Sequence, residues 1–241
     1  MSSRNPAEYS NDARAHWEKT IAAWDANRHG GDKTALSWIE RHSRLSPETI
    51  KYRYDVALAH LARHARDKRV VEIGCGPGRL SEKIIEAGAR TYRGYDIAEN
   101  AITLAQDGIA QSAFKDRIGF ECADASSLPA ITGDIVFSIG FLSWLTAEQI
   151  DRVFAVSEGL DFLHTITVRS YGYRQFLKWL HHLSEGPERY RVIYHNIGDI
   201  RAVAAKHGWP RLYVYRHRVL SPNVYVSSLP FPDTLGPQDI L

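Results

Sequence analysis

The chain of 241 residues contains only two cysteines, has no long apolar run and carries almost no net charge. Cys75 and Cys122 cannot form a disulfide framework, so we expect reduced thiols in a cytosolic protein. No spacing of cysteine and histidine predicts a metal site. No span approaches transmembrane length, and the polar amino terminus precedes no apolar signal segment. We therefore expect a soluble, cytoplasmic protein without a metal and without membrane insertion.

The charge balance excludes a large electrostatic field. Lys and Arg number 30 and Asp and Glu 28, which gives a net charge of +2. The densest basic stretch, residues 63–69, closes an expected helix, where cations offset the helix dipole. No run of Lys and Arg marks a nucleic-acid footprint, so no nucleic-acid partner is expected. The sequence has no internal repeat, and its length suits one domain with an appendage.

Residues 70–79, Val-Val-Glu-Ile-Gly-Cys-Gly-Pro-Gly-Arg, form the most informative stretch of the chain. The β-branched valines predict a buried strand, and the glycines predict a sharp turn into a helix near Pro77. Gly74, Gly76 and Gly78 can adopt backbone angles closed to other residues, and they lack the Cβ that would hold a ligand away. The free N–H groups and positive dipole end of the helix point back at the loop. This arrangement favours a small-molecule ligand above the turn.

The positions of the glycines separate the known loops of this kind. A dinucleotide fingerprint needs a glycine at position 79, where this chain has Arg79. A P-loop needs Lys and then Ser or Thr after its last glycine, whereas Arg79 and Leu80 follow Gly78. Both patterns are therefore excluded, and specific binding of nicotinamide cofactors is not expected. Taken alone, the loop remains compatible with another strand–turn–helix of an α/β protein.

The pattern E-x-G-x-G-x-G resembles motif I of the class I S-adenosylmethionine-dependent methyltransferases. This resemblance implies that Glu72 lies near the methionine amino group, through water, and that the three glycines border the cofactor. Residues 91–97 read as a second strand that ends at Asp96. A carboxylate there can accept hydrogen bonds from both hydroxyls of an adenosine ribose, so Asp96 resembles the ribose-binding acid of the family, with Ile97 beside it. An N-cap role of Asp96 for a helix over residues 98–106 is an alternative compatible with ribose binding.

Two further strands end in residues that the resemblance places at the cofactor. Residues 118–122 lead to Asp124, which in the family takes the adenine amino group, and to Ala125, whose backbone N–H donates to the ring. Residues 134–139 match the central strand of the family, and Ser138 and Ile139 would lend backbone carbonyls to the methionine ammonium. The expected cofactor is S-adenosylmethionine, and its product is S-adenosylhomocysteine.

The alternation of strands and helices from residue 69 to about 170 predicts a parallel sheet with helices on both faces. Later elements are expected as a strand over 160–168, helices over 171–183 and 197–206, and strands over 211–219 and 223–228. We therefore expect an α/β fold with a doubly wound, seven-stranded, mostly parallel sheet whose last strand is antiparallel. The expected divisions are an N-terminal helical lid over residues 1–66, a methyltransferase domain over 67–230 and an extended tail over 231–241.

The lid is expected to begin with a helix capped at Asn11-Asp12 and to include a helix over residues 47–66 that covers the cofactor and lines the acceptor pocket. Arg53 in that second helix precedes Gly74 by twenty-one positions. Some quinone-biosynthesis O-methyltransferases hold the methionine carboxylate with an Arg at close to that offset. The resemblance thus implies cofactor binding by Arg53, and a solvated helical Arg is the alternative.

Methyl transfer needs alignment of acceptor, methyl carbon and sulfur, and an oxygen nucleophile may also need a base. Ligands of open α/β sheets lie beyond the carboxyl ends of the strands, so acceptor-binding residues should follow the fourth and fifth strands or border them. Residues at such positions, taken as catalytic candidates, are His195, Tyr173 and Arg169. Phe141 and Trp144 are expected to line the pocket, and His164, within a strand, is expected to be a core residue.

The resemblance specifies the cofactor and is silent on the acceptor. The Asn-Pro-Pro-Tyr motif of nucleobase and glutamine methylation is absent, and residues 138–141 are closer to the pattern of small-molecule enzymes. We therefore expect a small molecule or a glycan or lipid precursor as partner, methylated at oxygen rather than nitrogen, and a monomer or homodimer. An RNA or protein methyltransferase and a catalytically silent S-adenosylmethionine-binding protein are the alternatives.

Overall fold

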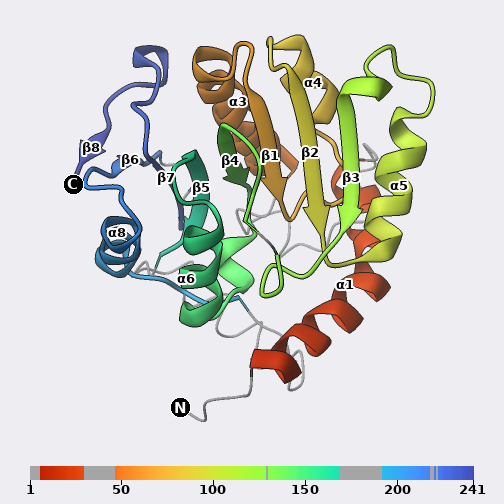
Figure 1. Cartoon of the computed structure of the whole chain (residues 1–241), viewed down its shortest axis with the longest axis horizontal. Coiled ribbons are helices and arrows are strands. Elements are labelled where there is room, and N and C mark those ends of the chain that lie inside the picture. Colours follow the sequence, from red (N-terminus) through yellow and green to blue (C-terminus); the bar gives the residue numbers. More distant parts are fainter. Residues whose placement is uncertain (1–5, 30–46, 129, 169–191, 218–219, 221) are drawn as a thin grey trace.

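The computed structural model describes residues 6–29, 47–128, 130–168, 192–217, 220 and 222–241. In these residues helices cover both faces of a single sheet (Figure 1). The α-helices are α1 (Pro6–His29), α3 (Pro47–His64), α4 (Ser81–Glu86), α5 (Glu99–Ile109), α6 (Ala147–Val156) and α8 (Ile197–Lys206). Short 3-10 helices are η2 (Lys115–Arg117), η3 (Leu142–Trp144) and η4 (Asp233–Leu235). The strands are β1 (Arg69–Ile73), β2 (Thr91–Asp96), β3 (Ile118–Cys122), β4 (Ile135–Ser138), β5 (Asp161–Thr167), β6 (Tyr213–Tyr215), β7 (Asn223–Ser227) and β8 (Asp239–Ile240).

The sheet has the strand order β3-β2-β1-β4-β5-β7-β6-β8. Strand β1 pairs in parallel with both β2 and β4, so the strand order reverses direction at β1. Open α/β sheets bind ligands in the crevice beyond the carboxyl ends of the strands at such a switch point. Strand β7 is antiparallel to both of its neighbours, β5 and β6. The expected doubly wound, mostly parallel sheet with an antiparallel strand near its end is confirmed.

The carboxyl-terminal tail adds one strand more than expected. Main-chain hydrogen bonds of 3.0 and 2.9 Å join Leu212 and Leu241 in both directions, and β8 pairs antiparallel with β6. Residues 231–241 therefore continue the sheet edge and include η4, where the sequence predicted an extended tail. Pairing with β6 satisfies backbone groups that an extended tail would leave to water. The division of the chain at residues 66 and 230 stays a prediction.

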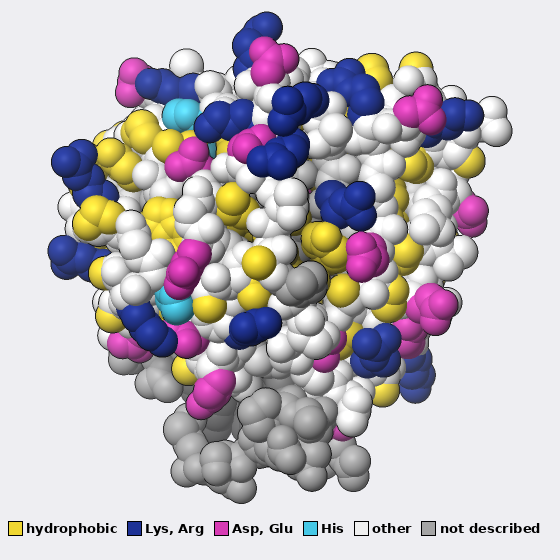
Figure 2. All heavy atoms as spheres, viewed as in Figure 1, with side chains coloured by type: hydrophobic (Ala, Val, Ile, Leu, Met, Phe, Trp, Pro, Cys, Tyr) yellow, Lys and Arg dark blue, Asp and Glu magenta, His cyan; other side chains and the backbone are white. Residues whose placement is uncertain are grey.

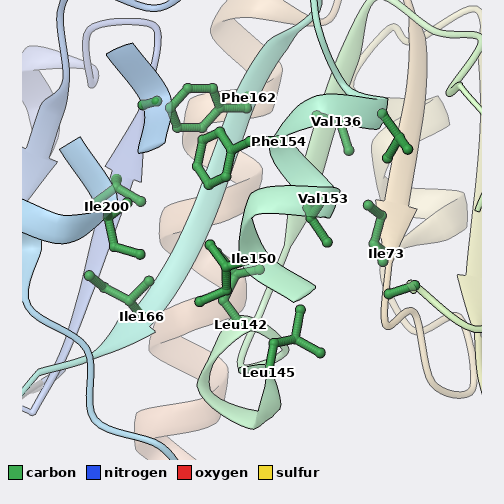
Figure 3. Packing of buried hydrophobic residues seen from close by; sticks show 14 of the residues in the cluster. Ile73, Val136, Leu142, Leu145, Ile150, Val153, Phe154, Phe162, Ile166 and Ile200 are labelled. Atoms are coloured by element: carbon green, nitrogen blue, oxygen red, sulfur yellow. The ribbon is translucent and has the colours of Figure 1, made fainter. Parts of the chain in front are cut away.

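Two apolar cores hold the central strands from opposite faces. Strands β1 and β4 are buried almost throughout, as parallel strands between helix layers are. On one face, Phe154 of α6 packs edge-on against Phe162 of β5, in one cluster with Val136 of β4 (Figure 3). On the other face, Leu61 of α3 packs in one cluster with Ile84 of α4. This double burial fixes the carboxyl ends of β1 and β4, where the candidate site lies.

Several predicted elements change their bounds in the structure. Helix α1 begins at Pro6 rather than at residues 11–12, because proline fits the first turn of a helix and needs no N–H partner there. Helix α6, which the sequence analysis did not place, begins with a capping box between Thr146 and Gln149. Strand β6 covers three residues rather than residues 211–219. The helix expected over residues 171–183 lies outside the described residues.

The covering helix at the carboxyl edge is α1 rather than α3. In Figure 1, α1 crosses below the arrowheads of β2 and β3 and beside α5. Helix α3 instead packs along the sheet through Val56, Ala57 and Leu61, which are fully buried. The middle of the 47–66 helix therefore packs on the sheet, and its covering of the cofactor stays a prediction that concerns its first turns around Arg53. Among the described helices, none is long and apolar enough to cross a membrane.

Candidate active site

The glycine loop follows β1 and turns through three positive φ angles. Gly74, Gly76 and Gly78 have φ values of +74°, +51° and +66°. A Cβ on Gly74 would lie 2.6 Å from the Phe141 ring, and one on Gly78 would lie 2.5 Å from the Phe120 ring. Gly74 and Gly78 are thus required by close packing as well as by their backbone angles. Gly76 has no such close neighbour, so it is the loop position most open to a ligand.

Asp96 joins the end of β2 to the glycine loop. Its Oδ2 accepts a hydrogen bond of 2.8 Å from the Gly76 N–H, and its Oδ1 accepts one of 3.0 Å from the Ala98 N–H at the start of α5. Burial raises the pKa of Asp96, and these backbone donors partly offset that rise. Each carboxylate oxygen keeps a second lone pair. The structure therefore fixes Asp96 in place while leaving acceptor capacity for hydroxyls. The N-cap residue of α5 is Ala98, without a side-chain cap, so the expected N-cap role of Asp96 is wrong.

Glu72 lies in β1, directly before the glycine loop, and is buried. The Tyr92 hydroxyl donates a hydrogen bond to its Oε2. Burial raises the pKa of Glu72 to about 8, the Tyr92 hydrogen bond opposes the rise, and the charge of Asp96 adds to it. The carboxyl is thus mostly protonated at neutral pH and would ionise if a cation were bound beside it.

The third carboxylate of the edge, Asp124, follows β3. Its Oδ1 accepts hydrogen bonds of 2.8 Å from both the backbone N–H and the hydroxyl of Ser126. Ala125 between them is buried in the core. Ser126 also lies 3.5 Å from the Ser10 hydroxyl of α1. The turn therefore holds Asp124 at the same edge as Asp96 and beneath the covering helix.

Beyond β4, the predicted cofactor residues Ser138 and Ile139 enter the core rather than open space. The Ser138 hydroxyl lies 2.9 Å from Nδ1 of His164 and is buried, so only its backbone can face a ligand. Ile139 is half-buried against the core on the α3 side of the sheet. His164 stacks on Phe162, and burial lowers its pKa to about 3, which keeps it neutral. The prediction that His164 is a core residue is confirmed.

Arg53 of α3 is a desolvated cationic side chain near the carboxyl end of β4. Its guanidinium is buried, its Nε has no hydrogen-bond partner, and burial lowers its pKa. Among the described residues no carboxylate pairs with it; its backbone carbonyl accepts a 2.6 Å hydrogen bond from the Tyr225 hydroxyl. Its Nη1 lies 3.7 Å from the position of a Cβ on Gly140, just beyond β4. A solvated Arg is therefore excluded, and Arg53 is a desolvated cation that has no carboxylate partner within the described part of the chain.

His195 borders the carboxyl ends of β4 and β5. Its Nε2 lies 2.9 Å from the Leu142 carbonyl, and its backbone N–H donates to the Thr167 carbonyl at 2.8 Å. A carbonyl only accepts, so Nε2 carries the proton and Nδ1 keeps a lone pair. Burial lowers the pKa of His195. The other catalytic candidates, Tyr173 and Arg169, lie outside the described residues.

Helix α1 covers the edge with an apolar side. Its Ile21 reaches to 3.9 Å from the position of a Cβ on Gly76. Its Trp17 packs with Ile97 in one cluster around Ala13 and meets the Trp144 ring edge-on, with ring centroids 5.2 Å apart. Ile97, predicted beside the cofactor, and Trp144, predicted to line the acceptor pocket, therefore both lie under α1.

Polar contacts of Glu18 and Asp25 also hold α1 in place, and the sequence analysis missed them. Both carboxylate oxygens of Glu18 accept from the backbone N–H groups of Glu99 and Asn100 at the start of α5. The buried Asp25 pairs with Arg79, the residue that excluded a dinucleotide fingerprint. Asp25 continues the i, i+4 spacing of Trp17 and Ile21, and an acid on an apolar stripe was the available signal.

A comparison with known proteins identifies this constellation. Residues 70–158, which include the glycine loop, Asp96, Asp124 and Ser138, match a family described as a methyltransferase domain. The chain contains a methyltransferase domain. Its fold is that of the class I S-adenosylmethionine-dependent methyltransferases, a family that uses this cofactor.

Curated relatives of this methyltransferase domain match over only part of their length. Methyltransferase GfsG of Streptomyces halstedii is 25% identical over 130 residues, which are 53% of this chain and 43% of GfsG. The ubiquinone biosynthesis O-methyltransferase of Burkholderia pseudomallei is 30% identical over 112 residues, which are 44% of this chain and 38% of that protein. The chain thus spans less than half the length of these relatives.

Solved structures extend the likeness of fold to nearly the whole chain. The magnesium protoporphyrin IX methyltransferase of Synechocystis, crystallised with bound S-adenosylhomocysteine, has a TM-score of 0.72 and covers 91% of this chain and 98% of its own. The [4+2]-cyclase SpnF has a TM-score of 0.62 and covers 92% of this chain. With 18% and 12% sequence identity, these two likenesses concern the fold.

A separate cleft lies at the opposite edge of the methyltransferase domain. It has a volume of about 690 Å³ and is lined by the amino ends of β1, β4 and β5 and by the end of α8. Its charged wall residues Lys68 and Asp161 pair with each other at 3.3 Å. The predicted cofactor residues Glu72 and Ser138 lie toward the opposite, carboxyl ends of β1 and β4. Within the described part of the chain, no cluster of three or more His, Cys, Asp or Glu side chains could hold a metal.

Lys and Arg side chains alternate with Asp and Glu over the face of the methyltransferase domain shown in Figure 2. This interleaving follows from the near-balance of charges in the sequence. The absence of a nucleic-acid partner stays a prediction.

Proposed function

We propose that this protein transfers a methyl group from S-adenosylmethionine to a small molecule or to a glycan or lipid precursor, at an oxygen atom. The observation that carries the proposal is Arg53, whose buried Nε has no hydrogen-bond partner among the described residues, at the edge where Asp96 retains free lone pairs. A buried cation without a partner is costly, and an anionic group of a ligand would compensate it. S-Adenosylmethionine carries a carboxylate, an ammonium and two ribose hydroxyls, which match the groups available here.

In this proposal, different residues of the edge bind different groups of the cofactor. Asp96 accepts from the ribose hydroxyls, and Asp124, Ala125 and Ile97 border the adenine. Arg53 binds the methionine carboxylate. The ammonium lies near Glu72 and the backbone carbonyls of Ser138 and Ile139, while Gly74, Gly76 and Gly78 border the chain between the two ends. Cofactor and acceptor alignment would supply most of the rate enhancement, because the sulfonium is already activated.

His195 is the proposed base. When bound, the cofactor supplies the methyl carbon: a bond forms from the acceptor oxygen to this carbon as the carbon–sulfur bond breaks, and that electron pair goes to sulfur. Nδ1 of His195 takes the acceptor's hydroxyl proton, which its lone pair and lowered pKa allow at neutral pH. Arg169 and Tyr173 remain candidates for orienting the acceptor.

An oxygen acceptor is supported by the name of one relative, the ubiquinone biosynthesis O-methyltransferase. A small acceptor is supported by that relative and by the apolar cover that Trp17 forms with Trp144. The alternating charge on the face shown in Figure 2 gives no support to RNA binding at that face, where phosphate contacts would dominate affinity. We propose a monomer or homodimer as the working assembly.

Two measurements test the function. Titration calorimetry should show saturable binding of S-adenosylhomocysteine and no saturable binding of NAD at the same concentrations, since Arg79 occupies the glycine position of the dinucleotide loop. A screen of hydroxylated small molecules with methyl-labelled donor should then give a labelled product. Saturable NAD binding without S-adenosylhomocysteine binding would refute the cofactor, and cofactor binding without any transfer would favour a silent binding protein.

A further inference from the structure

A buried row of polar side chains runs beside His195 and has no part in the cofactor contacts. Ser143 of η3, Thr167 at the end of β5 and Asn223 at the start of β7 are each at least nine-tenths buried. The Thr167 hydroxyl donates to Oδ1 of Asn223 at 2.9 Å, so its single proton is committed. The Ser143 hydroxyl, 2.7 Å away, must therefore donate to Thr167. The direction of the whole row is thus fixed.

This row joins the two main-chain segments that hold the His195 imidazole. Its Nε2–H donates to the carbonyl of Leu142, the residue before Ser143. Its backbone N–H donates to the carbonyl of Thr167 itself. The carbonyl of Ser143 also accepts from the Ile193 N–H at 2.7 Å. A bond between the Ser143 and Thr167 side chains therefore locks together the two carbonyls that determine where His195 lies and which of its nitrogens carries the proton.

The stability of the fold does not require polar side chains in this row. Among the described residues, each hydroxyl bonds only to its neighbours in the row, so replacing the whole row by apolar side chains of the same shape would cost little. A polar row that connects η3, β5 and β7 instead adds directional restraint, and precise placement of a proton-transferring group depends on such supporting contacts.

We infer that Ser143, Thr167 and Asn223 are positioning residues that hold His195 as the Nε2–H tautomer, with the Nδ1 lone pair directed to the acceptor's hydroxyl. The inference rests on the proposed role of His195 as base. It extends that role to three residues that touch neither cofactor nor acceptor, and it assigns the basic nitrogen of the ring.

The test uses the full chain with ¹⁵N-labelled histidine and needs no acceptor. Long-range proton–nitrogen NMR spectra distinguish a protonated from a bare ring nitrogen, and His195→Gln identifies the signals of His195 among the eleven histidines. In the wild type, His195 should be the Nε2–H tautomer. Thr167→Val, which removes the hydroxyl and keeps the shape, should give a mixture of both tautomers, and Thr167→Ser should restore the single form.

Ser157→Ala is the matched control, because it removes a buried hydroxyl that bonds only to the Val153 carbonyl in α6, away from His195. It should lower stability and leave the tautomer unchanged. If Thr167→Val does not fold, Ser143→Ala removes the same bond from its other end with less change in volume. A folded Thr167→Val or Ser143→Ala protein in which His195 stays a single Nε2–H tautomer would overturn the inference.

Once an acceptor is known, a double-mutant cycle adds a kinetic readout. Thr167→Val should lower kcat roughly tenfold with an unchanged KM for S-adenosylmethionine, and it should have no further effect in a His195→Gln background. If the two variants instead lowered kcat independently, so that their fold-changes multiplied in the double variant, the positioning role would be overturned. Full activity of His195→Gln alone would instead refute the proposed base. The tautomer spectra distinguish this failure from a failure of the positioning inference, because they need no acceptor.

Discussion

The carboxyl edge of the sheet has two parts: a proposed cofactor half around Asp96 and Asp124, and a proposed acceptor half around His195. Their hydrogen bonds run in opposite directions. On the cofactor half, backbone N–H groups of Gly76 and Ser126 donate to the carboxylates of Asp96 and Asp124. On the acceptor half, the ring of His195 donates to a backbone carbonyl. The first arrangement fixes acceptors and leaves lone pairs on carboxylates, whereas the second fixes a donor and leaves a lone pair on a neutral base. One half is thus suited to hydroxyls and a cation, and the other to taking a proton.

The halves also differ in how far their residues lie apart in the sequence. Most of the proposed cofactor half uses the ends of β1, β2 and β3, which follow one another within residues 72–125; Arg53 of α3 and the end of β4 complete it. The acceptor half combines η3, the end of β5, residues 192–195 and the start of β7, and it is covered by α1. Variants in each half therefore test different things: contacts to the cofactor in the first, and the alignment of separate segments in the second.

The largest expected effect comes from Asp96→Ala. It removes the acceptor of the Gly76 and Ala98 N–H groups and the proposed ribose ligand. Affinity for S-adenosylhomocysteine should fall by about 2–3 kcal/mol, or roughly 30- to 150-fold, the scale of charge-assisted hydrogen bonds lost from a buried site. Titration calorimetry measures this fall, and Asp107→Ala on the exposed side of α5 serves as control. Equal affinities of the wild type and Asp96→Ala would contradict the ribose assignment.

Arg53→Met should change stability and binding in opposite directions. Without ligand, the unfolding free energy should rise by about 1 kcal/mol, because an unpaired buried charge is replaced by an apolar chain of similar length. Affinity for S-adenosylhomocysteine should fall roughly tenfold through loss of a charge-assisted contact. Urea unfolding and calorimetry measure the two effects. Arg63→Met, at an exposed position of the same helix, is the control and should change neither. A destabilised variant that binds normally would show that Arg53 has a packing role only.

Glu72 links cofactor binding to pH. Its pKa of about 8 in the free protein leaves it mostly protonated at pH 7, and a neighbouring ammonium would lower that pKa. Binding should therefore release up to one proton near pH 7, and affinity should increase as pH rises toward 8. The proton count follows from binding enthalpies measured in buffers with different ionisation enthalpies. Glu72→Gln should release no proton; an equal release by the variant would place the coupled group elsewhere.

The same pKa sets the sign of a stability effect without ligand. The folded protein holds a proton on Glu72 between its ordinary pKa, near 4.5, and about 8, whereas the unfolded chain loses it. Stability therefore falls as pH rises through this window. Glu72→Gln should reduce that fall, which thermal unfolding at pH 5 and pH 8 would show.

The cofactor half was predictable from the sequence because its signals are local. Strand ends could be placed from apolar runs, and the carboxyl ends of parallel strands meet at one edge, so Asp96 and Asp124 follow from their positions after the second and third strands. The loop's glycines were identified. For two of them, however, a Cβ would also clash with the ring of Phe141 or Phe120, and only the packed structure shows this.

The acceptor half was less predictable because its contacts depend on strand order and on segments that return from afar. The bond from Thr167 to Asn223 exists because β7 pairs with β5, and a sequence gives no direct sign of that neighbour. The stripe of Trp17 and Ile21 indicated packing but not its target. For α6 a signal was present, since Thr146 and Gln149 have the spacing of a capping box.

The smallest expected effect tests whether α1 works as a cover that must open. Glu18 accepts from the first N–H groups of α5, where a negative charge also meets the positive end of the helix dipole. Glu18→Gln keeps one of the two oxygen acceptors and removes the charge, which should weaken this solvent-exposed contact by about 0.5 kcal/mol. Dissociation of S-adenosylhomocysteine, followed by stopped-flow fluorescence, should then be about twofold faster, since less energy is needed to lift α1 from the loop. The difference should shrink in 1 M salt, where surface charges are screened. Lys19→Gln, at the exposed neighbouring position, is the matched control. Equal dissociation rates for all three proteins at low salt would mean that the cofactor leaves without passing α1.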